Sequence, residues 1–170
     1  MKGTLVNRVA NSGIITVNLE LYYPNVEFAN FDIKDYLYME IILKEKEFRA
    51  SLKELDWTQY KGKVLLISCS ADAIIPLWAY MLVANLAEGI AIDSYVGDLE
   101  AYLNHHYHNT IASLNLEEFQ DKRIVIKGCG DKPVPAGAYQ SLTRKLKPIA
   151  LSIMYGEPCS MVPIYKKKKS

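Results

Sequence analysis

The stretch "KVLLISCSADAIIPLWAYML", residues 63–82, decides the fold, because it joins a short apolar run to a helical pattern through a compact loop. The run KVLLISC is rich in branched apolar side chains, which predicts a buried strand. Pro76 suits the first turn of a helix, and Gly89 suits its end. The stretch therefore predicts a strand, a loop and a helix in succession.

The same alternation continues along the rest of the chain. Apolar runs at 91–97, 123–129 and 150–156 predict three more strands, and helices are expected at 98–114, with Asp98 as N-cap, and at 135–146. We expect an α/β fold: a single domain over residues 1–165, with a mostly parallel central sheet and helices on both faces. Residues 166–170 are expected to form a flexible Lys-rich tail.

The N-terminal third is less regular. A strand is expected within residues 13–24, because this segment is rich in β-branched and aromatic residues and stops at Pro24. Charges alternate with apolar residues at helical spacing over 44–55, which predicts a helix. Residues 31–43 fit either a strand or a helix, and both remain open.

Two segments of the chain resemble each other. Residues 57–82 align with 116–142, so that Tyr60 matches Phe119 and Tyr80 matches Tyr139, each 59 positions on, whereas Cys69 matches Cys129 at 60 positions. This alignment needs one extra residue before the second cysteine and one fewer after it. Internal duplication and convergent use of a common strand–loop–helix unit are both open.

Composition excludes several classes of protein. The chain has 170 residues, half of them hydrophobic and 23% charged, which is typical of a soluble globular protein. The formal net charge is +1, but the lysines at 166–169 leave −3 for the rest, so neither nucleic acid nor a membrane is an expected partner. No signal peptide and no apolar run of about 18 residues is present, which favours the cytoplasm.

The familiar nucleotide and hydrolase motifs are also absent. The sequence has no GxGxxG, P-loop or GxSxG pattern, so no nucleotide cofactor is expected. Whether the protein is an enzyme stays open at this stage.

The cysteines point to a site at one edge of the predicted sheet. The carboxyl ends of parallel strands meet at one edge, and Cys69, Cys129 and Cys159 each follow a predicted strand end. Their odd number and wide spacing predict reduced thiols. Carboxylates accompany them, and these are Asp72, Asp98, Asp131 and Glu157.

Three convergent thiolates predict a metal site. Soft sulfur ligands suit zinc, iron or an iron–sulfur cluster, with one of the four carboxylates as a fourth ligand or as a hydrogen-bond partner of a ligand. Two alternatives stay open. Cys129 or Cys159 could act as a nucleophile or sulfur carrier, or the cysteines only pack inside a metal-free protein-interaction module.

Blocks along the whole chain resemble one family. The segments VNRVANSGIITVNLE, FDIKDYL, CSADAIIPLWAYML, GDLEA, DKRIVIKGCGDKPVP and GEPCSMVPIYK are similar to an uncharacterised bacterial family catalogued as domain of unknown function 2480. The likeness runs from about Val6 to Lys166 and includes all three cysteines. It implies a cytoplasmic bacterial protein. It also implies a link to iron–sulfur assembly, which would favour an iron–sulfur assembly partner, or iron or an iron–sulfur cluster as the bound metal. A homo-oligomer is the other expected assembly.

Overall fold

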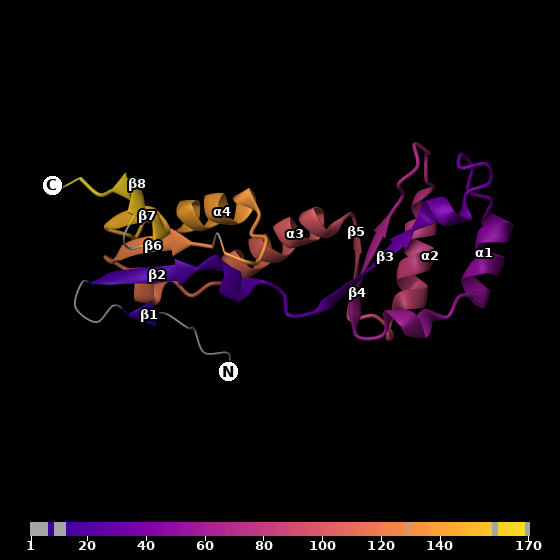
Figure 1. Cartoon of the computed structure of the whole chain (residues 1–170), viewed down its shortest axis with the longest axis horizontal. Helices are drawn as coiled ribbons and strands as arrows, with labels where there is room; N and C mark the ends of the chain where they lie inside the picture. The colour runs from indigo at the N-terminus through magenta and orange to yellow at the C-terminus, as the bar shows by residue number, and fades with distance from the viewer. Residues whose placement is uncertain (1–6, 9–12, 129, 158–159, 169–170) are drawn as a thin grey trace. The chain divides into compact units, whose positions relative to one another are not determined.

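The computed structural model describes residues 7–8, 13–128, 130–157 and 160–168, and its strands form two sheets, one mixed and one entirely parallel (Figure 1). The five-stranded sheet has the order β1-β2-β6-β7-β8, and the three-stranded sheet has the order β3-β4-β5. The strands are β1 (Asn7–Arg8), β2 (Ile14–Asn18), β3 (Glu27–Asp32), β4 (Lys63–Ser68), β5 (Asp93–Val96), β6 (Arg123–Lys127), β7 (Ser152–Glu157) and β8 (Ser160–Lys166).

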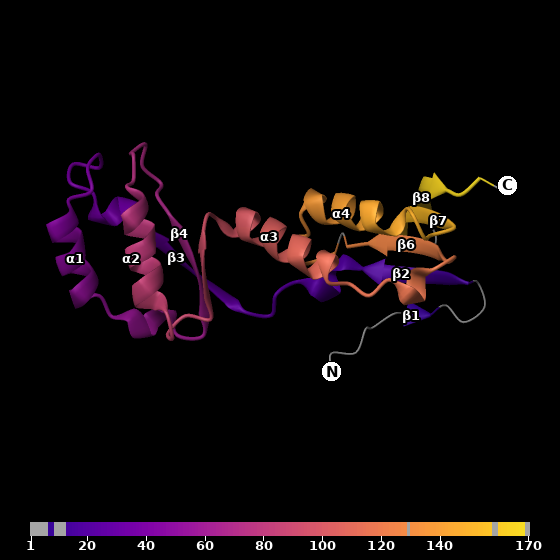
Figure 2. The same ribbon diagram turned by 180° about the vertical axis from the view of Figure 1, so that it is seen from behind.

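Helices alternate with these strands (Figure 2). The α-helices are α1 (Glu45–Glu54), α2 (Leu77–Ala87), α3 (Leu99–Ala112) and α4 (Ala136–Leu146), and the short 3-10 helices are η1 (Leu19–Tyr22), η2 (Ile33–Tyr36), η3 (Trp57–Tyr60) and η4 (Glu117–Phe119). In the described part of the chain four of the six strand pairings are parallel, and the other two, those of β1 and β8 at the edges of the larger sheet, are antiparallel. The predicted α/β class with mostly parallel pairing is confirmed.

The ambiguous segment 31–43 is neither one strand nor one helix. It holds the end of β3, then η2, and then a tight hairpin in which Tyr38 pairs with Ile42. In the segment predicted as a tail, Lys166 is the last residue of β8 and the Lys167 N–H donates to Leu151 O at 2.9 Å.

The chain divides into two compact units, each with one of the sheets. Unit 1 holds residues 1–24 and 103–170, and unit 2 holds residues 25–102. Whether the two units fold together as the single domain expected over residues 1–165 depends on whether each is stable without the other, so this expectation stays a prediction.

Unit 2 packs both of its helices on one face of its sheet. Phe31, Leu65 and Ile67 point to this face and are almost completely buried. The opposing residues lie at helical spacing, with Phe48 and Leu52 on α1 and Ala79, Val83 and Ala87 on α2. On the other face, Tyr102 from the first turns of α3 packs edge-on against Phe28 and Tyr95.

Unit 1 buries a polar contact at the centre of α3. The Tyr107 side chain is fully buried, and its hydroxyl donates to Leu19 O at 3.0 Å. Burial, followed by the nearby Tyr139, Tyr23 and Glu20, raises the pKa of Tyr107, so this hydroxyl keeps its proton. Helices α3 and α4 are joined by Lys145, whose ammonium group donates to three carbonyl oxygens at the end of α3, those of Ile111, Ala112 and Leu114.

The two units share one strand register. Val64 of β4 lies opposite Asp93 of β5, and Arg123 of β6 lies opposite Ser152 of β7, each 59 positions on. The first strands also agree, because β3 pairs with β4 as β2 pairs with β6, with β2 placed 14 positions before β3. The core positions shifted by 59 are Phe48 and Tyr107, Leu52 and Ile111, Tyr60 and Phe119, Leu65 and Ile124, Ala79 and Ala138, Val83 and Leu142, and Ala87 and Leu146.

Turns and caps repeat with the same shift. Asp56 accepts from Thr58 N at the start of η3, and Asn115 accepts from Glu117 N at the start of η4. Agreement over a complete β-α-β-α-β unit indicates internal duplication. Unit 2 is inserted in the connection between η1 and α3 of unit 1, at the place where unit 2 itself has its Tyr38–Ile42 hairpin.

The duplication changes the alignment of the cysteines. The loops from the end of β4 to Pro76 and from the end of β6 to Pro135 are equally long, so the shift stays at 59 throughout and needs no inserted residue. The position equivalent to Cys69 is therefore Gly128. Cys69 and Cys129 stand at neighbouring places in the two units.

Candidate functional site

The predicted three-cysteine metal site is wrong in its premise, because the strands concerned do not share a sheet edge. Cys69 follows β4 in the three-stranded sheet, whereas Cys129 and Cys159 follow β6 and β7 of the five-stranded sheet. Cys129 and Cys159 themselves lie outside the described residues. Among the residues that the structure describes, no group of three or more His, Cys, Asp or Glu side chains could hold a metal ion.

The four accompanying carboxylates are divided between the two units, with two in each. Asp72 is exposed in the loop after β4, and Asp131 is exposed in the loop after β6. Asp98 accepts from Ala101 N at 2.8 Å, which confirms it as the cap of α3. Glu157, at the end of β7, accepts from Lys127 Nζ at 3.1 and 3.2 Å.

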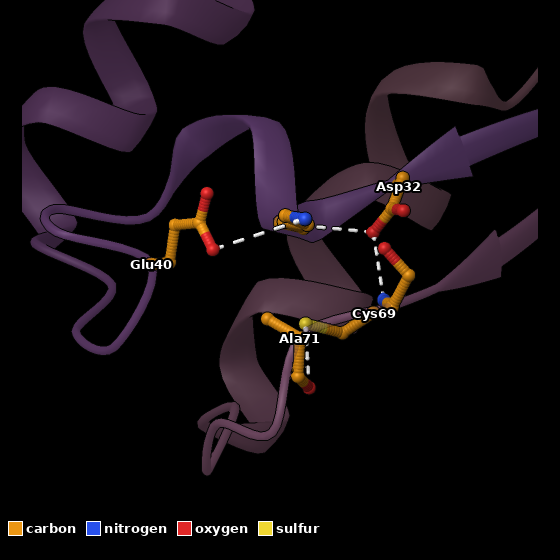
Figure 3. A network of polar contacts seen from close by, with 6 residues as sticks. Asp32, Glu40, Cys69 and Ala71 are labelled. Carbon is orange, nitrogen blue, oxygen red and sulfur yellow. Dashed lines mark hydrogen bonds and ion pairs between the residues drawn. The ribbon is translucent and has the colours of Figure 1, made fainter.

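A polar network does lie at the carboxyl edge of unit 2 (Figure 3). Asp32 Oδ1, at the end of β3, accepts from the backbone N–H of Lys34 and from that of Ser70, both at 3.0 Å. Lys34 Nζ lies 3.8 Å from Glu40, and half-buried Cys69 directs its thiol to Ala71 O at 3.7 Å. The network ties together the loops that follow β3 and β4.

Hydrogen bonds set the ionisation of Asp32. Desolvation opposes ionisation, but the Ser70 hydroxyl, the two backbone N–H donors and the Lys34 charge together lower the pKa of Asp32 below its ordinary value. The carboxylate is thus a structural acceptor. Its equivalent in unit 1, Asn18, accepts from Glu20 N in the same way at 3.1 Å.

Replacing Asp32 by alanine should lower the free energy of unfolding of unit 2 by about 1.5–3 kcal/mol, because two backbone donors lose their acceptor. Asp32→Asn should cost less than about 1 kcal/mol, since Asn18 occupies the equivalent place in unit 1. Urea unfolding followed by tryptophan fluorescence measures both, because Trp57 and Trp78 lie in unit 2.

The same pair of variants has a defined pH dependence. A lowered pKa stabilises the fold above the unfolded value of 3.8, and this stability is lost as the pH falls below it. The advantage of the wild type over Asp32→Asn should therefore vanish in acid. Equal destabilisation by both substitutions at neutral pH would contradict the structural role.

At the carboxyl edge of the unit 1 sheet, Glu20 binds the loop that follows β6. Its carboxylate accepts from Lys132 N at 3.2 Å and lies so close to Gly130 that a Cβ there would be 2.7 Å from Glu20 Oε1. Lys132 Nζ lies 5.1 Å from the centre of the Tyr23 ring. These contacts hold the loop after β6 against η1.

An apolar groove lies beside this edge, between α4 and the strands β6, β7 and β8. Its volume is about 630 Å³, within the range of small-molecule sites. The apolar lining consists of Ile126, Val134, Ala136, Met154 and Ile164, and the polar lining consists of Tyr139, Gln140, Thr143, Arg144 and Tyr155.

One charge and a pair of rings give the groove its chemical character. Tyr139 and Tyr155 meet edge to face with ring centres 5.7 Å apart, and the Thr143 hydroxyl donates to Tyr139 O. Arg144 is the only charged residue among the described residues that line the groove. The same described lining residues include no carboxylate, histidine or thiol, and their polar groups are the hydroxyls of Tyr139, Thr143 and Tyr155, the Gln140 amide and the Arg144 guanidinium.

A larger hollow, of about 900 Å³, runs along α1 in unit 2. Half of its lining is charged, and these residues are Lys46, Arg49, Lys53 and Glu54. Such a surface is solvated rather than built for a ligand, so the groove in unit 1 is the better candidate.

Sequence reasoning missed this groove because one of its walls is β8. Pro163 in "SMVPIYK" argues against a strand, yet β8 is an edge strand with an irregular register opposite Met154, where a proline is tolerated. The helical spacing of Ala136, Tyr139, Gln140 and Thr143 was readable, but what faces them was not.

Comparison with known proteins places the chain within one group. A family model described as "Protein of unknown function (DUF2480)" matches residues 3–167, which confirms the resemblance seen in the sequence. No curated protein and no solved structure matches the chain. No helix among the described residues is long and apolar enough to cross a membrane.

Proposed function

The chain belongs to the DUF2480 family of proteins of unknown function, and from its own geometry we propose that it binds a small anionic molecule with an apolar body in the groove of unit 1. The observation that carries this proposal is an apolar groove of ligand size in which Arg144, a cation, is the one charged residue among the described lining residues. The apolar body would lie against Ile126, Met154 and Ile164. The anionic group would accept hydrogen bonds from the Arg144 guanidinium.

Comparison of the two units supports this reading. The residues of α2 that correspond to Gln140, Thr143 and Arg144 are Met81, Ala84 and Asn85, so unit 2 has neither the cation nor the adjacent hydroxyl. Unit 2 also has no strand equivalent to β8 in the described part of the chain. The proposed binding function is thus specific to unit 1.

Anilinonaphthalene sulfonate is a suitable probe, because it combines an aromatic body with an anion. Its fluorescence should rise on binding, Arg144→Gln should weaken binding about five- to tenfold, and Ala136→Trp should abolish it by filling the groove. Position 136 tolerates a larger side chain, since its equivalent in unit 2 is Leu77.

Two control variants separate the groove from other surfaces. Arg123→Gln removes an exposed cation at the opposite end of β6 and should leave binding unchanged. Met81→Gln removes an exposed apolar side chain of unit 2. If Met81→Gln reduces the fluorescence of the bound probe, and Arg144→Gln and Ala136→Trp leave it unchanged, the proposal is wrong.

A further inference from the structure

Strand β5 is an edge strand of the unit 2 sheet. Its equivalent in unit 1, β7, pairs with β6 on one side and antiparallel with β8 on the other. Among the described residues, β5 pairs only with β4. Gly97 N–H donates to Ile67 O, so alternation along the strand directs the backbone groups of Tyr95 to β4 and the carbonyl group of Ser94 to the open edge, while the Ser94 N–H donates to Asp93 Oδ1.

Large apolar side chains gather at this edge. Val96 lies opposite Ile67, on the face that carries α2, and alternation places Ile92 on that face as well. Ile92 and Val96 are 59% and 56% exposed, and Leu77 and Met81 on α2 are 80% and 71% exposed. Isolated exposed apolar residues are ordinary, but four on one strand edge and its flanking helix mark an interaction surface.

The duplication supplies an internal comparison for these residues. The counterparts of Leu77 and Met81 are Ala136 and Gln140, which border the groove that β8 closes with Ile164. The backbone of the unit is therefore compatible with small or polar residues at both positions. In unit 2 the same two positions are large and apolar, and no strand among the described residues pairs with the outer side of β5.

We propose that unit 2 pairs with a second copy of the chain through β5, antiparallel and centred on Ser94. If α2 of both copies lies on the same face of the joined sheet, even-numbered residues of one β5 pair with even-numbered residues of the other. Ile92 then lies opposite Val96 of the second copy. Asp93 then lies opposite Tyr95 of the second copy. No like charges oppose each other, and the interface is self-complementary, as a two-fold interface requires.

Helix α2 extends this interface. The Leu77 and Met81 side chains of the two copies flank the joined strands on the same face, so the new contact buries apolar surface in addition to backbone hydrogen bonds. The other edge, β3, is less suited to such pairing, because its exposed residues, Glu27 and Asn30, are polar.

Sedimentation velocity on the full chain, from about 1 to about 100 μM, should show a shift from monomer to dimer. Val96→Lys and Met81→Lys should each weaken the dimer about tenfold or more, because each places a charge in the apolar contact. Met39→Lys is the matched control: it changes an equally exposed apolar side chain at the hairpin tip and should leave the dimer intact.

Cross-linking tests the register. In an antiparallel pair centred on Ser94, the two Cα atoms lie about 5.5 Å apart, within the range that a disulfide spans, so Ser94→Cys should give a disulfide-linked dimer on mild oxidation. Wild type, which keeps its native cysteines, and Ser113→Cys, at the end of α3, should cross-link far less. A wild type that stays monomeric throughout this range, or a dimer indifferent to both lysine variants, would overturn the proposal, as would Ser94→Cys cross-linking no better than Ser113→Cys.

Discussion

Replacing Gly156 by alanine is expected to lower the free energy of unfolding of unit 1 by about 2–4 kcal/mol. Gly156 has a φ of +118°, which strains any residue with a Cβ. A Cβ there would also lie 2.5 Å from Ser160 O, a backbone atom of β8. Gly156 pairs with Met161, so relief of this contact would displace β8 from β7 and open the wall of the groove.

Gly97 provides the matched control, since it occupies the equivalent place in unit 2. Its φ is +143°, but an added Cβ would meet side chains, Tyr95 Cε1 at 3.0 Å and Ala101 Cβ at 3.1 Å. These can shift, so Gly97→Ala should cost about 1–2 kcal/mol.

Two probes distinguish these effects. Tryptophan fluorescence follows unit 2, which holds Trp57 and Trp78, and far-ultraviolet circular dichroism follows both units. In Gly156→Ala, part of the unfolding transition seen by circular dichroism should occur at a lower urea concentration than the transition seen by tryptophan fluorescence. An unfolding curve unchanged by Gly156→Ala would contradict the predicted strain.

The strands and helices around residues 63–156 could be predicted because their patterns are local. The apolar runs ending near Ser68 and Lys127 and the helical spacing of Ala79, Val83 and Ala87 each report burial directly. Strand β3 was missed because "EFANFD" has no continuous apolar run, and two of its residues are exposed.

The prediction of a metal site was wrong because it depended on which sheet each strand joins, and no local sequence pattern contains this information. Equal strand–loop–helix units were assigned to one sheet, and the cysteines were then brought to one edge. An alignment without gaps would have matched Pro76 with Pro135 and Cys69 with Gly128, and would have weakened the argument from shared thiols. No local sequence pattern predicted the apolar groove. Arg144 lies on α4 and Ile164 on β8, and only the tertiary structure brings these two elements together.

A chain in which residues 24–102 are replaced by the six residues of Tyr38–Leu43 is expected to fold as unit 1 alone. In unit 2 this segment joins η2 to α1, and Tyr23 and Leu103 stand at the equivalent ends in unit 1. The remaining chain keeps the five-stranded sheet, α4 and ten of the fourteen residues of α3. It should retain a cooperative unfolding transition and the affinity of the groove for anilinonaphthalene sulfonate, although almost half of the protein has been removed.

Loop closure favours this shortened chain. Strands β2 and β6 pair in parallel across a connection that contains all of unit 2, and its removal shortens that connection about threefold. The entropy of closing the loop then falls by about 1 kcal/mol, and folding should become faster. Circular dichroism during urea unfolding and stopped-flow refolding would measure both. An unfolded or non-cooperative product would show that unit 1 depends on unit 2 for its stability, as a single domain over residues 1–165 requires.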